Sequence, residues 1–155
     1  METDAEMLDL AIAEARVGLA EGGIPIGAVL EADGEVLGAG HNRRVQDGSA
    51  IRHAETDALE AAGRLPASVY ARSTMVTTLS PCPMCTGAIL LYGIPRVVVG
   101  ENRTFQGSED LLRAHGVEVV VLDSDECVGM MRDFTAAHPM LWNEDIGVVD
   151  DDLKP

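Results

Sequence analysis

The sequence predicts an α/β protein: a three-layer α/β/α sandwich around a mixed five-stranded sheet. Apolar residues make up 46% of the 155 residues, which is enough for one packed core of ordinary size. An amphipathic segment is followed by two short runs joined by a tight turn, and such strands must be antiparallel. The later β-branched runs alternate with helical segments, which favours parallel strands covered by helices on both faces.

The N-terminal half begins with a predicted helix over residues 4–21. Its apolar side chains recur at helical spacing, and Gly22-Gly23 ends it, because glycine is common just past a helix. Residues 26–31 and 35–40 are predicted to form a hairpin around an Asp33-Gly34 turn. Residues 41–50 are polar and predict a loop.

The second half is predicted to alternate between helices and strands. Cys127 falls on the last of these helices and is expected to be a small core residue. The predicted elements are a helix over 51–62, a strand over 75–79, a helix over 83–92, a strand over 96–100, a helix over 108–114, a strand over 117–122, a helix capped by Asp123 or Ser124, and a tail from Pro139.

Two short motifs supply ligands that a metal ion prefers. His53-Ala54-Glu55 is followed by Pro81-Cys82-Pro83-Met84-Cys85. One imidazole and two thiolates leave the fourth tetrahedral position of zinc open for water, as in catalytic rather than structural zinc sites. Cys82 and Cys85 can converge from one helical turn, and a helix N-terminus favours the thiolate. His53 and Glu55 can face one site only near the end of a helix, so we expect them in a first turn.

Glu55 is left as a free carboxylate beside this site. Zinc lowers the pKa of a bound water towards about 7, and Glu55 could take that proton and pass it to a substrate nitrogen and then to a leaving amine. The H-x-E…P-C-x-x-C spacing is the known signature of zinc-dependent nucleobase deaminases. We therefore expect a deaminase with one zinc ion per chain.

Other interpretations of the same residues exist. A thioredoxin-like C-x-x-C would leave His53 and Glu55 without a role. A structural zinc site closed by His41 or His115 is compatible with the composition and would make the chain a non-catalytic zinc-binding protein. Glu55 distinguishes these cases, because a structural site needs no free carboxylate beside the metal.

The net charge of −15, from 26 acidic and 11 basic residues, argues against nucleic-acid binding, which depends on Lys and Arg. No segment approaches the roughly 20 apolar residues that cross a bilayer. The N-terminus is acidic and lacks the features of a secretory signal. We expect a cytoplasmic protein without a membrane or nucleic-acid partner.

Further segments lie in unbroken order along almost the whole chain: residues 21–27 (EGGIPIG), 40–42 (GHN), 77–82 (TTLSPC), 85–89 (CTGAI), 92–95 (YGIP), 98–102 (VVGEN) and 142–147 (WNEDIG). Together they resemble the fungal-type cytosine deaminases of the cytidine/deoxycytidylate deaminase superfamily. The resemblance implies an α/β/α homodimer that converts free cytosine to uracil and ammonia. We therefore expect residues 1–147 to form a single zinc-dependent deaminase domain. Residues 148–155 have no counterpart in the family; they are acidic and are expected to form a frayed tail.

By position, the resemblance assigns zinc to His53, Cys82 and Cys85, and the proton shuttle to Glu55. It places Asn42 at one edge of the base, and Asp145 at the other edge and the amine. The implied substrate-binding residues are Asn42, Asp145, Ile26, Ala54, Ser80, Phe105 and Trp142.

Two departures from the family pattern bear on the substrate. Ala54 replaces a glycine, and its small methyl group is expected to change little. Asn143 stands where the family usually has an aromatic residue, which is expected to thin one pocket wall. The alternatives are therefore isocytosine, guanine or a related azine, and adenosine in tRNA, which the acidic charge disfavours.

Overall fold

A mixed sheet runs through the structure, a computed structural model in which residues 3–149 are described and form five strands in the order β2-β1-β3-β4-β5. Strand β1 is antiparallel to both β2 and β3, whereas β3, β4 and β5 are parallel. The predicted mixed five-stranded sheet is thus confirmed. The strands are β1 (Gly27–Ala32), β2 (Glu35–His41), β3 (Ser73–Leu79), β4 (Arg96–Glu101) and β5 (Glu118–Val121).

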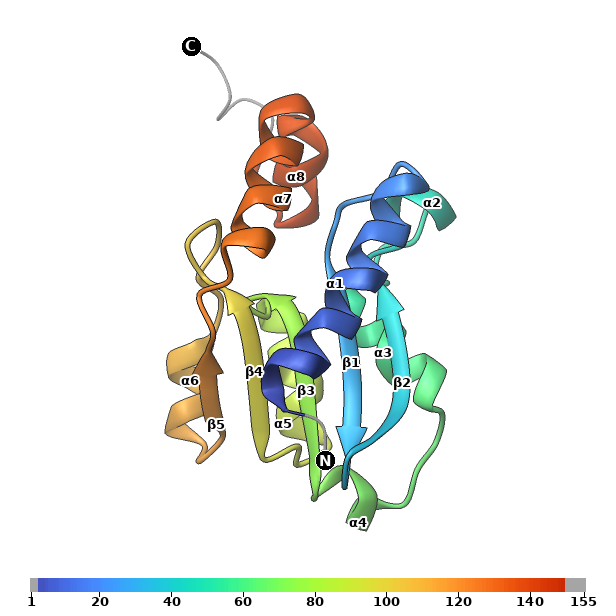
Figure 1. The fold of residues 1–155 in the computed structure, drawn as a ribbon, viewed down its shortest axis with the longest axis vertical. Helices are drawn as coiled ribbons and strands as arrows, with labels where there is room; N and C mark the ends of the chain where they lie inside the picture. The colour runs from blue at the N-terminus through green and yellow to red at the C-terminus, as the bar shows by residue number, and fades with distance from the viewer. Residues whose placement is uncertain (1–2, 150–155) are drawn as a thin grey trace.

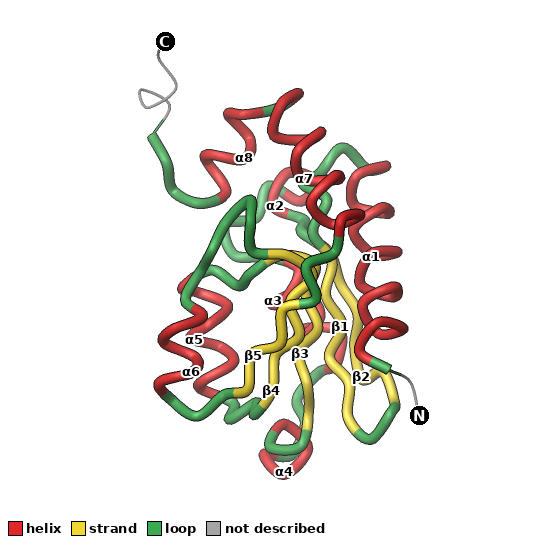
Figure 2. Tube along the Cα trace, turned by 60° about the vertical axis from the view of Figure 1, so that its left-hand side comes forward, coloured by secondary structure: helices red, strands yellow, loops and turns green. Residues whose placement is uncertain are grey.

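Helices cover both faces of the sheet, which confirms the predicted three layers. Figure 2 shows α1 on one side of the strands and α5 and α6 on the other. Val29, Val76 and Val98, one on each of β1, β3 and β4, pack with α1 and α7. Their neighbours along the same strands lie on the opposite face of the sheet and pack with α3 and α5. The main helices are α1 (Asp4–Ala20), α3 (Ala54–Ala62), α5 (Pro83–Leu91), α6 (Glu109–Ala114), α7 (Asp125–Ala137) and α8 (Pro139–Asp145).

Local chemistry explains where several elements begin. The Thr3 hydroxyl accepts from the Glu6 amide and the Glu6 carboxylate accepts from the Thr3 amide, a capping box that starts α1. Asp33 and Gly34 both have positive φ, as the predicted hairpin turn requires.

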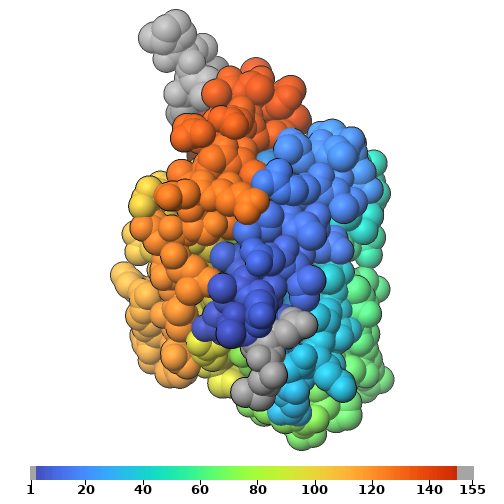
Figure 3. Space-filling model, viewed as in Figure 1, coloured from blue at the N-terminus to red at the C-terminus, as the bar shows by residue number. Residues whose placement is uncertain are grey.

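Cys127, on α7, is buried in the core that α7 shares with α1, as the predicted core position requires. These two helices lie side by side in Figure 3.

Several predictions of secondary structure were wrong or incomplete. Short helices α2 (Arg44–Asp47) and α4 (Ala67–Tyr70) were not predicted, and the expected tail after Pro139 is helix α8. These helices are too short to show a clear period in the sequence. Strand β3 begins at Ser73 rather than residue 75, and α3 begins at Ala54 rather than residue 51. Most of the predicted tail 148–155 lies outside the described residues.

The carboxyl ends of β3 and β4 meet at one edge of the sheet, below α7 and α8 (Figure 1). Helix α5 begins just after β3, and α3 begins beside it. In α/β sheets, ligands bind at such an edge because loops and helix N-termini converge there. No helix within residues 3–149 is long and apolar enough to cross a membrane.

Candidate metal centre and substrate pocket

The predicted metal ligands lie at the starts of two helices. His53 is the N-cap residue of α3 and Cys82 is the N-cap residue of α5, both with extended backbone. Cys85 follows in the first turn of α5. The Nδ1 atom of His53 lies 3.3 Å from the Cys82 sulfur and 3.7 Å from the Cys85 sulfur. The three ligand atoms lie within 4.8 Å of one another, so these side chains are positioned to bind one metal ion.

The donor set and its spacing fit zinc. Zn–N bonds of about 2.0–2.1 Å and Zn–S bonds of about 2.3 Å at tetrahedral angles place nitrogen and sulfur about 3.5 Å apart. The two measured N···S separations, 3.3 and 3.7 Å, bracket that value. The side chains that could have closed the site do not reach it. The ring of His41 is hydrogen-bonded to two glutamates, and that of His115 to the Leu111 carbonyl.

Asp145 lies behind the imidazole of His53. Its Oδ1 is 3.5 Å from His53 Nε2, the nitrogen that faces away from the sulfurs. Histidines that bind metals usually direct their second nitrogen to a carboxylate or carbonyl, which fixes the ring orientation. Although burial lowers the pKa of His53, the neighbouring Asp145 and Cys82 raise it to about 10. The same contact keeps the pKa of Asp145 low despite its burial, so Asp145 is ionised.

The two thiols are electrostatically different. A hydrogen bond from Cys85 lowers the pKa of Cys82 to about 4, and His53 acts in the same direction. The contact with Cys82, together with burial, raises the pKa of Cys85 well above its ordinary value. The start of α5 therefore stabilises a negative charge on Cys82 before any metal binds.

Glu55 points into the same site and is 4% exposed. The hydroxyl of Thr77, on β3, donates to Glu55 Oε1 at 2.5 Å. Burial raises the pKa of Glu55, and hydrogen bonds from Cys85 and Thr77 only partly offset this. A carboxyl group with a raised pKa can both accept and return a proton near neutral pH, as a general base and acid must.

A small cavity of about 20 Å³ lies beside His53, Glu55 and Cys82. Asn42 does not line it, but its side-chain amide donates to Asp145, which does. Phe105 and Trp142 form an edge-to-face pair, with ring centroids 6.1 Å apart and planes at 83°. The structure thus brings all the predicted site residues together. Besides His53, Glu55 and Cys82, the predicted site residues that line the cavity are Ile26, Ala54, Ser80, Phe105, Trp142 and Asp145.

That Asn143 thins one pocket wall stays a prediction. On helix α8, Trp142, Asp145 and Ile146 line the cavity, whereas Asn143 does not. Helix α8 was not predicted, and without a helix the face on which each of these side chains lies could not be assigned. Leu79, at the end of β3, also lines the cavity and was not predicted.

Further polar contacts were missed because they join distant segments. Arg44 Nη1 lies 3.3 Å from Asp145 Oδ1 and also binds Glu144. The Ser80 hydroxyl donates to Glu109, which is 1% exposed. No spacing in the sequence connects these residues, so only the folded chain reveals them.

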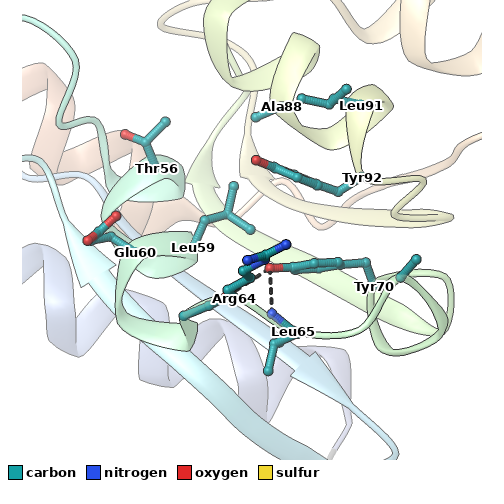
Figure 4. Close-up of a pocket in the computed structure, with 11 residues that line it drawn as sticks. Thr56, Leu59, Glu60, Arg64, Leu65, Tyr70, Ala88, Leu91 and Tyr92 are labelled. Carbon is teal, nitrogen blue, oxygen red and sulfur yellow. Dashed lines mark hydrogen bonds between the residues drawn. The ribbon is translucent and has the colours of Figure 1, made fainter.

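A larger cavity of about 790 Å³ lies away from this site, between α3, α4 and α5. In Figure 4, Leu59 comes from α3, Tyr70 from α4, and Leu91 and Tyr92 from the end of α5. The rings of Tyr70 and Tyr92 stack with centroids 4.9 Å apart. No predicted metal ligand or substrate-binding residue lines this cavity.

Comparisons with known proteins agree with this geometry. Residues 1–101 match the model of the cytidine and deoxycytidylate deaminase zinc-binding region. The chain is 54% identical to a cytosine deaminase of Candida albicans, over 93% of this chain and 97% of the relative. It is 35% identical to a tRNA-specific adenosine deaminase of Streptococcus pyogenes, over 86% of this chain and 91% of the relative.

Two solved structures have the same fold. One comes from a study of tRNA:A34 deaminases, with a TM-score of 0.68 and 26% identity over 81% of this chain and 99% of that one. The other, a guanine deaminase from Nitrosomonas europaea, has a TM-score of 0.70 and 23% identity over 88% of this chain and 86% of that one. With its matching zinc-binding region and its His53–Cys82–Cys85 cluster, the chain belongs to the cytidine and deoxycytidylate deaminase family of zinc-binding proteins.

Proposed function

We propose that this protein hydrolyses free cytosine to uracil and ammonia, using one zinc ion held by His53, Cys82 and Cys85. The observation that carries the proposal is the set of residues around one small pocket. A buried carboxylate, a metal-binding cluster and an aromatic wall face each other there, and the Asn42–Asp145 pair adjoins them. The 54% identity to a cytosine deaminase along nearly the whole chain supports this substrate.

Bound zinc would supply Lewis acidity, which makes water a nucleophile near neutral pH. Glu55 would accept a proton from the attacking water and deliver it to the ring nitrogen of the base. It would then take the remaining proton of that oxygen, now bonded to the ring carbon, and pass it to the exocyclic amine, so that the carbon–nitrogen bond breaks, the new carbonyl forms and the amine leaves as ammonia. Thr77 holds the Glu55 carboxylate in place during these transfers through its hydroxyl.

The pocket polar groups match the edges of cytosine. The Asp145 carboxylate, kept ionised by His53, would accept a hydrogen bond from the exocyclic amine. Asn42 would bond the opposite polar edge, and Ser80 and Ala54 would border the ring. Phe105, Trp142 and Ile26 supply the apolar walls that a flat base requires.

A panel of substrates tests this proposal. We expect zinc-dependent ammonia release from cytosine, with much lower kcat/KM for isocytosine, guanine and cytidine, and none for tRNA. The net charge of −15 opposes polyanion binding. A higher kcat/KM for guanine or for tRNA would assign the same chemistry to a different substrate, and no ammonia from any of them would reject the enzyme.

We also propose that the protein is a homodimer formed through α5 and the neighbouring ends of α3 and α4. Leu91 is 75% exposed and Tyr92 43% exposed beside the cavity of Figure 4. Met84, at the other end of α5, is also exposed. A continuous apolar face on an outer helix is characteristic of an interface. A second copy is the proposed partner because family resemblance implies a homodimer.

We further propose that residues 1–147 form the deaminase domain and that the protein works in the cytoplasm. The metal-binding chemistry supports this compartment, because Cys82 and Cys85 must remain free thiols to bind zinc. All cysteines among the described residues are free. Oxidation of this pair in the isolated native protein would contradict the assignment.

A further inference from the structure

Glu109 is a buried carboxylate outside the proposed catalytic residues. It opens helix α6 and is 1% exposed. Its Oε2 accepts a hydrogen bond from the Ser80 hydroxyl at 2.6 Å, and its Oε1 accepts one from the side-chain amide of Asn102 at 3.3 Å. Arg113, 3.7 Å away, is half-exposed. Burying a carboxylate is unfavourable unless hydrogen bonds satisfy it, so this arrangement depends on both partners.

Ser80 connects Glu109 to the loop between β4 and α6. While its hydroxyl donates to Glu109, its oxygen accepts from the Gly107 amide at 2.9 Å. The Ser108 amide also donates to the Pro81 carbonyl. A Cβ atom at position 107 would lie 1.9 Å from the Pro81 carbonyl oxygen, so only glycine permits this approach. The loop is thereby fixed to the segment that ends at Cys82.

The same loop carries Phe105, part of the pocket wall. At its other end, the buried carboxylate of Glu101 accepts from the amides of Arg103 and Thr104, at 2.8 and 2.9 Å. Phe105 then packs edge-to-face against Trp142 on α8. Buried carboxylates thus hold both ends of the loop, and the aromatic ring is presented between them.

We propose that Glu109 is a positioning residue that fixes Ser80 and the Phe105 wall and thereby sets the affinity of the pocket for the base. This inference rests on the proposed function for its kinetic part. Glu109 does not line the cavity, so it acts through Ser80 and the loop. Removing its carboxylate leaves the Ser80 hydroxyl without its acceptor and weakens the attachment of Gly107.

The kinetic test compares Glu109→Ala, Glu109→Gln and Asp110→Asn in the zinc-loaded protein. Asp110 is the adjacent residue on α6, with a side chain that is 98% exposed, and serves as the matched control. We expect Glu109→Ala to raise KM for cytosine about tenfold, the effect of one lost hydrogen bond to a charged group, with kcat changed less. Glu109→Gln retains a neutral acceptor for Ser80 and should restore most of the affinity. Asp110→Asn should match the wild type.

A second readout does not depend on turnover. Trp142 is the only tryptophan of the chain, so its fluorescence reports on the Phe105 wall. We expect acrylamide to quench Trp142 more strongly in Glu109→Ala than in the wild type, with partial return in Glu109→Gln. If the wild type deaminates no base, the proposed function fails and the quenching alone decides the role of Glu109.

Two results would overturn the inference. One is unchanged KM and unchanged quenching in Glu109→Ala. The other is a parallel loss of zinc, thermal stability and kcat in Glu109→Gln, which would indicate a general structural role. If Glu109→Ala does not fold, Glu109→Asp decides, because its carboxylate is one methylene shorter and reaches Ser80 less well: an increased KM and increased quenching with full zinc content support positioning, and wild-type values reject it.

Discussion

The side-chain amide of Asn42 donates to both carboxylate oxygens of Asp145, at 3.1 and 3.2 Å, across a separation of 103 residues. This pair connects the end of β2 to helix α8 at the edge of the pocket. Because Asp145 also lies against His53 and Arg44, it joins the proposed substrate contacts to the metal centre. A change at Asn42 should therefore affect substrate binding more than zinc binding.

We expect Asn42→Ala to lower kcat/KM for cytosine by about ten- to a hundredfold, because it removes a proposed substrate contact and a hydrogen-bond donor to Asp145. Zinc content should remain at one per chain. Asn143→Ala is the matched control, since Asn143 is on α8 but does not line the cavity. Steady-state kinetics of both variants provide the measurement. An equal loss of kcat/KM in the two variants would contradict a specific role for Asn42 in substrate binding.

Glu55→Gln should retain the fold and zinc but lose about 10²–10⁴-fold in kcat, because an amide cannot shuttle the proton. Glu60→Gln, on the exposed part of the same helix, should keep wild-type activity. Ammonia release and metal analysis on both proteins provide the measurement. Activity of Glu55→Gln within tenfold of the wild type would require another proton carrier.

Metal content distinguishes the cysteines. Cys85→Ser should abolish stoichiometric zinc binding, because a hydroxyl is a poor substitute for a thiolate ligand. Cys127→Ser should keep one zinc per chain, since Cys127 lies in the core between α1 and α7. Elemental analysis after dialysis measures the difference. Loss of zinc from Cys127→Ser would reject the proposed ligand set.

Leu91→Asp should convert the proposed dimer to a monomer, because it places a charge on the exposed apolar face at the end of α5. Light scattering of the wild type should give twice the chain mass of 16.4 kDa. Leu111→Asp, at an exposed leucine of α6, should remain dimeric. A monomeric wild type at micromolar concentration would contradict the proposal.

The ion pair between Asp4 and Arg96 should make stability depend on pH. The bidentate contact, at 2.6 and 2.7 Å, connects the start of α1 to β4, and the hydrogen bond from Arg96 lowers the pKa of Asp4 below 3.8. The stabilisation is therefore complete above pH 3.8 and disappears as pH falls through the lowered folded-state pKa. Because the pair is partly exposed, we expect it to contribute about 0.2–1 kcal/mol.

Urea unfolding of Asp4→Asn measures this contribution. The variant should be less stable than the wild type at neutral pH and equally stable once Asp4 is protonated. Asp9→Asn, at an exposed position of the same helix, should differ little from the wild type at either pH. A constant difference between Asp4→Asn and the wild type across this range would show that the charge of Asp4 is not responsible.

Local sequence patterns were sufficient to predict the metal-binding residues and the fold class. The ligands His53, Cys82 and Cys85 sit at helix starts, where local spacing decides which side chains can converge. Strand and helix periods likewise depend on near neighbours, so the mixed sheet and its two helical layers could be predicted. Helix α8 could not, because its single short run carries no clear period.

The distant side chains that complete the site could be identified only in the folded chain. Thr77 donates a hydrogen bond to Glu55, and Ser80 donates one to Glu109. Arg44 forms an ion pair with Asp145, and each of these contacts joins separate segments of the chain. Such contacts arise from the way the sheet brings loops together at one edge, and no local pattern encodes them. The absence of Asn143 from the cavity lining has the same origin: a helix fixes which face a residue occupies, and packing of α8 fixes where that face lies.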